Sequence, residues 1–147
     1  VIKNIFLTIF NFKCWFSCST EQLELFNPLI PDSFTSFFVL SSCSFNIGLN
    51  DQNIALHLNP RFDVWGDKDT IVLNSVENSK WKDEVQPGGF CFFRGESFKI
   101  IIKFKCKGFS ITLPNGSRIT VPNCIYANKY SYFRFDGDVS ISSVEIR

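Results

Sequence analysis

The feature that most constrains the fold of this chain is an alternation of apolar and polar side chains. Between residues 98 and 106 every even position is apolar, and three of the odd positions carry lysine. The apolar members are Phe98, Ile100, Ile102, Phe104 and Cys106, and the lysines are Lys99, Lys103 and Lys105. A period of two gives one face for a core and one face for water, which is typical of a half-buried β-strand. The segment therefore predicts a strand with its cysteine in the core.

The same period recurs after residue 51, interrupted by turn residues. Phe109, Ile111 and Leu113 precede the turn sequence Pro-Asn-Gly-Ser at 114–117, and apolar residues resume at Ile119. The Asn-Gly pair favours a tight hairpin turn. Further strands are predicted at 53–58, 69–75, 90–93, 130–135 and 139–146. Because each strand has one apolar face to bury, we predict an all-β protein in which two antiparallel sheets pack as a sandwich.

Composition and charge exclude several classes of function. The 147 residues suffice for one domain, and the net charge of +1, without a basic cluster, argues against nucleic acid as a partner. No apolar run approaches the ~20 residues of a membrane helix, so we expect no membrane insertion. The single histidine removes most metal sites and any catalytic scheme that needs two. The six cysteines are too sparse for a disulfide framework, Cys14 and Cys18 are interpreted as free thiols, and no cofactor is predicted.

Residues 1–42 differ in character from the rest of the chain. Nine of the 18 phenylalanines but only five of the 29 charges lie in residues 1–45. Because there is no methionine, we expect a fragment, a processed product or a defective gene model. Two origins stay open for the first residues: a degenerate signal peptide over 1–20, or translated non-coding sequence. We therefore divide the chain into an atypical segment, 1–42, and a domain, 43–147.

Polar residues of several kinds share one face of the predicted strand that runs through residues 54–62. Ile54, Leu56, Leu58 and Phe62 face one way, so the residues between them face the other. These opposite residues are His57, Asn59 and Arg61, and the next strand adds Val72 and Asn74 to the outward face. Trp81 and Glu84 follow after a loop and offer an apolar plate and an anionic acceptor.

Such a set of groups suits a sugar. Hydroxyl groups both donate and accept hydrogen bonds, and one face of a pyranose consists of C–H bonds that pack on an indole ring. Imidazole, amide and guanidinium groups donate, and a carboxylate accepts while it holds the guanidinium flat. Each residue alone also has an ordinary structural reading: a solvated histidine, a turn asparagine, a surface ion pair or a core tryptophan.

Taken together, the spacing of these residues resembles the sugar-binding signature of the galectin family. The signature H-x-N-P-R-F is matched by residues 57–62, its Val-x-Asn strand by 72–74, and W-G-x-E-x-R in part by 81–86. The resemblance extends from about Cys43 to the C-terminus and includes the Leu-Pro-Asn-Gly hairpin at 113–116. It covers most of the chain, and its motifs are specific to the family.

The resemblance implies a galectin-type jelly roll that binds β-galactosides, such as lactose and N-acetyllactosamine, on its concave sheet face without a metal. It implies a lectin and not an enzyme. Trp81 would stack under galactose, and Glu84 would also reach the next sugar. The implied carbohydrate-binding set is His57, Asn59, Arg61, Val72, Asn74, Trp81 and Glu84. Galectins leave the cell by a non-classical route, so cytoplasmic and extracellular locations are both implied.

Three departures from the family matter. Lys82 stands where the family has glycine, and Gln86 stands where it has arginine. Loss of that arginine predicts weaker binding, by ~1–3 kcal/mol for one charge-assisted hydrogen bond. Residues 1–40 contain no match to the first strands of the family, so we expect an edge strand of each sheet to be missing or replaced. This change leaves a homodimer open but disfavoured.

Two other classes of function stay open. One is a galectin-like structural or protein-interaction protein that has lost sugar binding, consistent with Lys82 and Gln86. The other is a glycosidase, because sandwich folds can hold paired carboxylates. Asp83 and Glu84 are adjacent in the chain, however, and no second outward acid joins the strand of His57, which argues against an enzyme.

Overall fold

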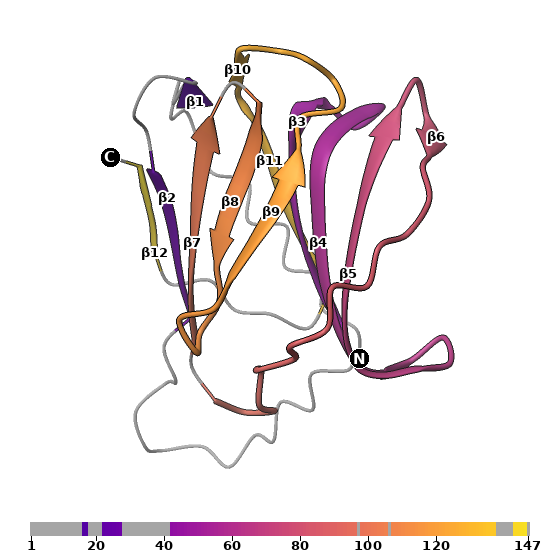
Figure 1. The fold of residues 1–147 in the computed structure, drawn as a ribbon, viewed down its shortest axis with the longest axis vertical. Coiled ribbons are helices and arrows are strands. Elements are labelled where there is room, and N and C mark those ends of the chain that lie inside the picture. The colour runs from indigo at the N-terminus through magenta and orange to yellow at the C-terminus, as the bar shows by residue number, and fades with distance from the viewer. Residues whose placement is uncertain are drawn as a thin grey trace.

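The computed structural model describes residues 16–17, 22–27, 42–96, 98–105, 107–137 and 143–146. In these residues the chain forms two five-stranded antiparallel sheets, which lie as two layers in Figure 1. The first sheet, which we call the site sheet, has the order β11-β3-β4-β5-β6. Its strands are Tyr132–Gly137, Cys43–Asn50, Asn53–Val64, Asp67–Glu77 and Lys80–Trp81 in that order.

The second sheet, which we call the support sheet, has the order β12-β2-β7-β8-β9. Its strands are Ser143–Ile146, Gln22–Asn27, Phe98–Lys105, Gly108–Thr112 and Arg118–Pro122 in that order. A short pair joins β1 (Phe16–Ser17) to β10 (Lys129–Tyr130). The predicted all-β sandwich is confirmed.

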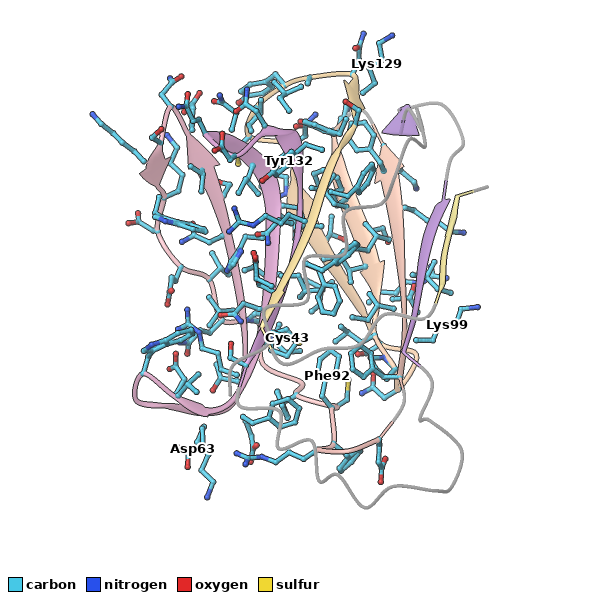
Figure 2. The ribbon with its side chains drawn as sticks, turned by 180° about the vertical axis from the view of Figure 1, so that it is seen from behind. Cys43, Asp63, Phe92, Lys99, Lys129 and Tyr132 are labelled. Atoms are coloured by element: carbon cyan, nitrogen blue, oxygen red, sulfur yellow. The ribbon has the colours of Figure 1, made fainter. Side chains whose placement is uncertain are left out.

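The core lies between the two sheets and is rich in aromatic rings. In β7 the even positions Ile100, Ile102 and Phe104 are buried, as the alternation predicts. The Phe104 ring stacks on Phe109 of β8, with 5.0 Å between ring centroids. Figure 2 shows the side chains that fill the interior, with Phe92 toward one end of the sandwich.

The predicted hairpin is present, and one predicted strand is not. The Leu113 N–H donates to the Ser117 carbonyl at 2.8 Å, and Gly116 has a φ of 84°, which glycine adopts readily. The prediction of a strand at 90–93 was wrong, because this segment is irregular. Glycines at 88, 89 and 95 with positive φ turn the chain away from a sheet. The segment instead covers the end of the core, where the Phe90 ring lies 5.2 Å from that of Phe62.

The N-terminal segment contributes a strand to the interior of the support sheet. β2 pairs with β7, Leu23 opposite Ile102 and Leu25 opposite Ile100, and pairs with β12 on its other side. Residues 22–27 therefore supply a strand where we expected one to be missing or replaced. The proposed signal peptide lies almost wholly outside the described residues, and Cys14, Cys18 and Cys106 lie outside them. No helix in the described part of the chain is long and apolar enough to cross a membrane.

Candidate functional site

A row of polar side chains runs along one face of β4, in the middle of the site sheet. His57, Asn59 and Arg61 form this polar row. The strand register places Asn46 of β3 and Asn74 of β5 on either side of His57. The structure thus brings together the residues that the sequence pattern placed on one face. It also shows that much of the row is buried.

Arg61 is the most strongly held member of the polar row. Its side chain is 10% exposed and forms a 2.5 Å bond from Nη1 to Asp67 Oδ2. Nη2 donates to Glu84 Oε1 at 2.7 Å, and Nη1 also donates to Glu84 Oε2 at 3.3 Å. One guanidinium therefore bridges two carboxylates, and this group carries a net charge of −1. Such bidentate pairing fixes the plane of the guanidinium.

Asn59 serves as an internal support for Arg61. The Asn59 side chain accepts a hydrogen bond from Arg61 Nε at 2.8 Å and donates from Nδ2 to the Cys43 carbonyl at 2.6 Å. Pro60 has no backbone N–H and cannot donate a hydrogen bond to a neighbouring strand. The side-chain amide of the adjacent Asn59 supplies a donor to β3 in its place. Asn59 is only 3% exposed, although we expected it on an exposed strip. Its hydrogen bonds make it a positioning group within the sheet.

His57 is held as a neutral imidazole. Its Nδ1 lies 2.6 Å from Asn46 Oδ1. The Asn46 Nδ2 donates to acceptors on Ser44, Arg134 and Asp136, so Oδ1 is the acceptor toward the ring. That network assigns the proton to Nδ1 and leaves Nε2 as a hydrogen-bond acceptor.

The surroundings of His57 disfavour its charged form. Burial, and next the nearby Arg61 guanidinium, lower the pKa of His57 to about 4. The carboxylates of Asp136 and Glu84 act in the opposite direction but do not offset this effect. His57 is therefore uncharged at neutral pH, and its pKa is set by desolvation more than by any single partner.

Trp81 lies on the short strand β6 and faces the polar row. Its ring centroid is 4.8 Å from that of His57, in an edge-on arrangement, and 56% of its surface is exposed. The strand pairs Trp81 with Val76 of β5. The indole is therefore fixed at its base and open to solvent, as a stacking plate requires.

Glu84 is placed by backbone pairing of the irregular segment that follows β6. Leu73 and Val85 exchange two backbone hydrogen bonds, of 2.8 and 2.9 Å, which hold this segment against β5. Glu84 stays partly exposed while it pairs with Arg61. Asn74 accepts from the Ser75 backbone N–H at 2.8 Å, so its amide nitrogen remains a donor for a ligand.

Val72 lies on the predicted face of the site sheet but is covered there. It pairs with Asn59, which places the two side chains beside each other on the same face, and it is 0% exposed, so neighbouring groups cover its side chain. Lys82, which replaces the family glycine, pairs with Glu77 at 2.7 Å. Gln86, which replaces the family arginine, donates to Asp67 Oδ1 at 3.2 Å.

Sequence reasoning missed three residues that shape the site. Asn46 orients His57, Asp67 pairs with Arg61, and the Arg61 guanidinium lies 5.1 Å from the Trp65 ring centroid. The Trp-Gly pair at 65–66 was the available signal, because a two-residue turn places Asp67 opposite Val64. Within the described residues, no group of three or more His, Cys, Asp or Glu side chains is arranged to hold a metal ion.

Two packed antiparallel sheets, with a hydrogen-bonded polar row and an exposed indole on one face, define the class of this protein as a β-sandwich with a candidate binding face. The model of the galactoside-binding lectin family matches residues 34–146, and the chain belongs to this family, the galectins. The match begins before Cys43, where the resemblance in sequence was first evident. Members of this family are lectins and not enzymes.

Named relatives and solved structures agree with this assignment. A β-galactoside-binding lectin of Electrophorus electricus is 44% identical over 102 residues, which cover 69% of this chain and 74% of that protein. The crystal structure of the Dario rerio galectin-1-L2 matches with a TM-score of 0.75 and 35% identity, covering 90% of this chain and 98% of the other. CG-16, a homodimeric agglutinin from chicken liver, matches with a TM-score of 0.76 and 25% identity, covering 91% and 98%.

Proposed function

We propose that this protein is a lectin that binds β-galactosides, such as lactose and N-acetyllactosamine, on the polar row without a metal. The observation that carries the proposal is the pairing of an exposed indole, Trp81, with a neutral His57 at a ring distance of 4.8 Å. An apolar plate beside a hydrogen-bond acceptor matches a pyranose, which has a C–H face and hydroxyl donors. The galactoside-binding lectin among the relatives supports the same ligand class.

Each group of the site has a distinct part in binding. The Nε2 of His57 accepts a hydrogen bond from a galactose hydroxyl, and the amide of Asn74 donates to another. The bonds of Arg61 to Asn59, Asp67 and Glu84 occupy four of its five N–H groups, which leaves one for the ligand. Glu84, held by Arg61 and still partly exposed, accepts from the ligand.

The test removes the Trp81 indole and measures lactose affinity and thermal stability separately. We expect lactose to bind the unaltered protein in a calorimetric titration and Trp81→Ala to weaken binding at least tenfold, because the C–H face of the sugar loses its partner. The melting temperature should change little, since Trp81 is largely exposed.

Phe93→Ala is the matched control, because Phe93 is also a large exposed apolar residue but lies in the segment that covers the end of the core. It should leave lactose affinity unchanged. Retained affinity in Trp81→Ala would show that the plate is wrongly assigned. Absence of heat at millimolar lactose with a folded sample would overturn the lectin proposal.

A second candidate is a galectin-like protein-interaction module that has lost sugar binding. The observation in its favour is Gln86, which is neutral and donates to Asp67. Residue 86 therefore provides no second cationic partner for Glu84. Co-purification with a protein that millimolar lactose does not displace, together with no retention on lactose beads, would favour this candidate.

We infer cytoplasmic and extracellular locations from the family, as well as glycoconjugates as partners. The chicken agglutinin is described as homodimeric. A homodimer of the present chain is a separate proposal, and light scattering measures it directly. A mass of one chain at micromolar concentration would exclude it.

A further inference from the structure

We propose that Asn115 is a site of spontaneous covalent modification, at which the side chain loses its amide group through a cyclic imide formed with Gly116. The products are aspartate and isoaspartate, and the only other reactant is water. Asn115 and Gly116 form the one Asn-Gly pair in the sequence. The inference concerns the support sheet and does not depend on sugar binding.

Asn115 lies at the tip of the hairpin that joins β8 to β9, at one end of the support sheet (Figure 1). Residues 114–118 are all exposed, so water reaches both the side chain and the backbone. A β-carbon added at Gly116 would meet no atom of another segment within 4 Å. The peptide nitrogen of Gly116, which closes the imide ring, is therefore shielded neither by a side chain of its own nor by a neighbouring segment.

The side-chain amide of Asn115 is held with its carbonyl group polarised. Its Oδ1 accepts hydrogen bonds from the Ser117 backbone N–H at 3.0 Å and from the Ser117 Oγ at 2.7 Å. Two donors on one carbonyl oxygen stabilise the negative charge that develops there when a nucleophile attacks the carbonyl carbon. Among the described residues, Nδ2 has no hydrogen-bond partner, so the leaving group points to solvent.

The reaction balances with water as the co-reactant. The Gly116 nitrogen gives up its proton and attacks Asn115 Cγ, a new C–N bond forms, and the bond from Cγ to Nδ2 breaks with release of ammonia. Water then opens the imide at one of its two carbonyl carbons. Opening at Cγ restores the peptide bond and gives aspartate, whereas opening at the backbone carbonyl gives isoaspartate. Either product replaces a neutral amide with a carboxylate.

A hydrogen bond of the turn sets the pace of this reaction. The Gly116 N–H donates to the Leu113 carbonyl at 2.9 Å, so its nitrogen attacks only while that bond is open. Exposed turns open locally at a free-energy cost far below that of global unfolding. The turn therefore slows the modification and does not prevent it.

The products destabilise the hairpin. Isoaspartate adds a methylene to the backbone of a turn whose length is fixed by the pairing of Thr112 with Arg118. The new carboxylate also lies near Glu96, because Asn115 and Glu96 line the same hollow, so the two charges repel. Leu113, which enters the turn, is buried in the core. The modification thus lowers stability from the support sheet and leaves the polar row intact.

The experiment incubates the folded protein at mildly alkaline pH and follows the tryptic peptide 108–118 by mass spectrometry. We expect the mass of this peptide to change from that of an amide to that of a carboxylic acid, with separate aspartate and isoaspartate products. The melting temperature of the modified protein should fall by about 3 °C, whereas its lactose affinity should equal that of unmodified protein.

Asn50 is the matched control within the same chain. It is exposed, and its Oδ1 likewise accepts two hydrogen bonds, from the Gln52 N–H at 3.0 Å and from Asn53 Nδ2 at 3.1 Å. The residue that follows it is Asp51 and not glycine. Asn115 should react about tenfold faster, because the Asp51 side chain hinders the attacking nitrogen and its charge opposes loss of the proton. Equal rates at the two sites, or a faster reaction at Asn50, would overturn the proposal.

Two variants test the path through the imide. Ser117→Ala removes one donor to Asn115 Oδ1 and keeps the backbone N–H, so modification should slow about threefold. Asn115→Gln should abolish it, because glutamine must close a larger ring. The proposed path is disproved if the rate in Ser117→Ala is unchanged or higher, or if aspartate forms without isoaspartate.

Discussion

The two sheets of the sandwich bury their residues in different ways. In β7 of the support sheet, the side chains at 99, 103 and 105 are exposed, and their neighbours at 100, 102 and 104 are buried. In β4 of the site sheet, residues 58–62 are all buried. One face of β4 packs on the core, and its other face is covered by the polar row with its partners. β7 is thus an ordinary half-buried strand, whereas the middle of β4 is covered on both faces.

Burial of the polar row of β4 is unfavourable in itself, and hydrogen bonds between its side chains and their partners offset this desolvation. Buried polar groups are unfavourable unless they are paired. In the described residues no buried side-chain nitrogen or oxygen lacks a hydrogen-bond partner. Asn59, Arg61 and Asn46 each form several such bonds. The proposed ligand would therefore meet groups that are already oriented, which would reduce the entropy lost on binding.

Removing Arg61 should break the site sheet more than any other single change in the row. Arg61→Ala leaves the Asn59 oxygen and two carboxylates without their cation, so we expect the free energy of unfolding to fall by ~3 kcal/mol. Lactose binding should be lost. Urea denaturation and calorimetric titration measure the two effects.

Phe109→Ala is the control in the support sheet. Phe109 is fully buried, so its truncation should destabilise by ~3–5 kcal/mol yet leave lactose affinity unchanged in the folded protein. If the two variants lost affinity equally, the separate roles of the sheets would be disproved.

The protonation of His57 gives a second test of the buried site. Its pKa is about 4 in the folded protein and about 6.5 when unfolded, so the unfolded chain takes up the proton first as the pH falls. The stability contributed by neutral His57 is complete above pH 6.5 and is lost as the pH approaches 4. We expect a loss of ~2–3 kcal/mol over this range that is absent from His57→Gln.

The same titration is directly visible by NMR, because the chain has one histidine. The imidazole signals should show a midpoint near pH 4. Lactose affinity should hold down to about pH 5 and decline below it, since a protonated Nε2 donates and no longer accepts. A midpoint near the ordinary histidine value would mean that the site is more solvated than the structure indicates.

Burial in β7 was more predictable from sequence than burial in β4, because β7 has one covered face and β4 has two, whereas β2 of the support sheet was not predicted at all. Alternation in β7 is a local signal, and it gave the strand and its buried face correctly. The spacing of His57, Asn59 and Arg61 likewise gave their common face on β4. Burial of Asn59 and Val72 did not follow from spacing, because it depends on the side chains that neighbouring strands bring to the row.

Partners from distant segments were beyond local reasoning. Asn46 meets His57 only because β3 pairs with β4, and Asp67 meets Arg61 only through the register of the β4–β5 hairpin. The apolar residues at 90–93 look like a strand, but the positive φ values at Gly88 and Gly89 determine their path. The roles of the seven predicted site residues in sugar binding stay predictions until affinities are measured.

The smallest expected effect is that of a substitution at Gln86, where the family has arginine. It tests how the net negative charge of Arg61 with its two carboxylates affects binding. Gln86→Arg adds a cation beside Asp67, to which Gln86 already donates at 3.2 Å. The new guanidinium can share the carboxylates that Arg61 now holds alone, and it supplies further donors for the second sugar. We expect lactose affinity to rise about fivefold, or ~1 kcal/mol, while methyl β-galactoside affinity stays the same. Gln86→Lys, which has charge without the planar fork, is the control and should gain less. An equal gain for both ligands would place residue 86 against galactose itself and not against the sugar that follows it.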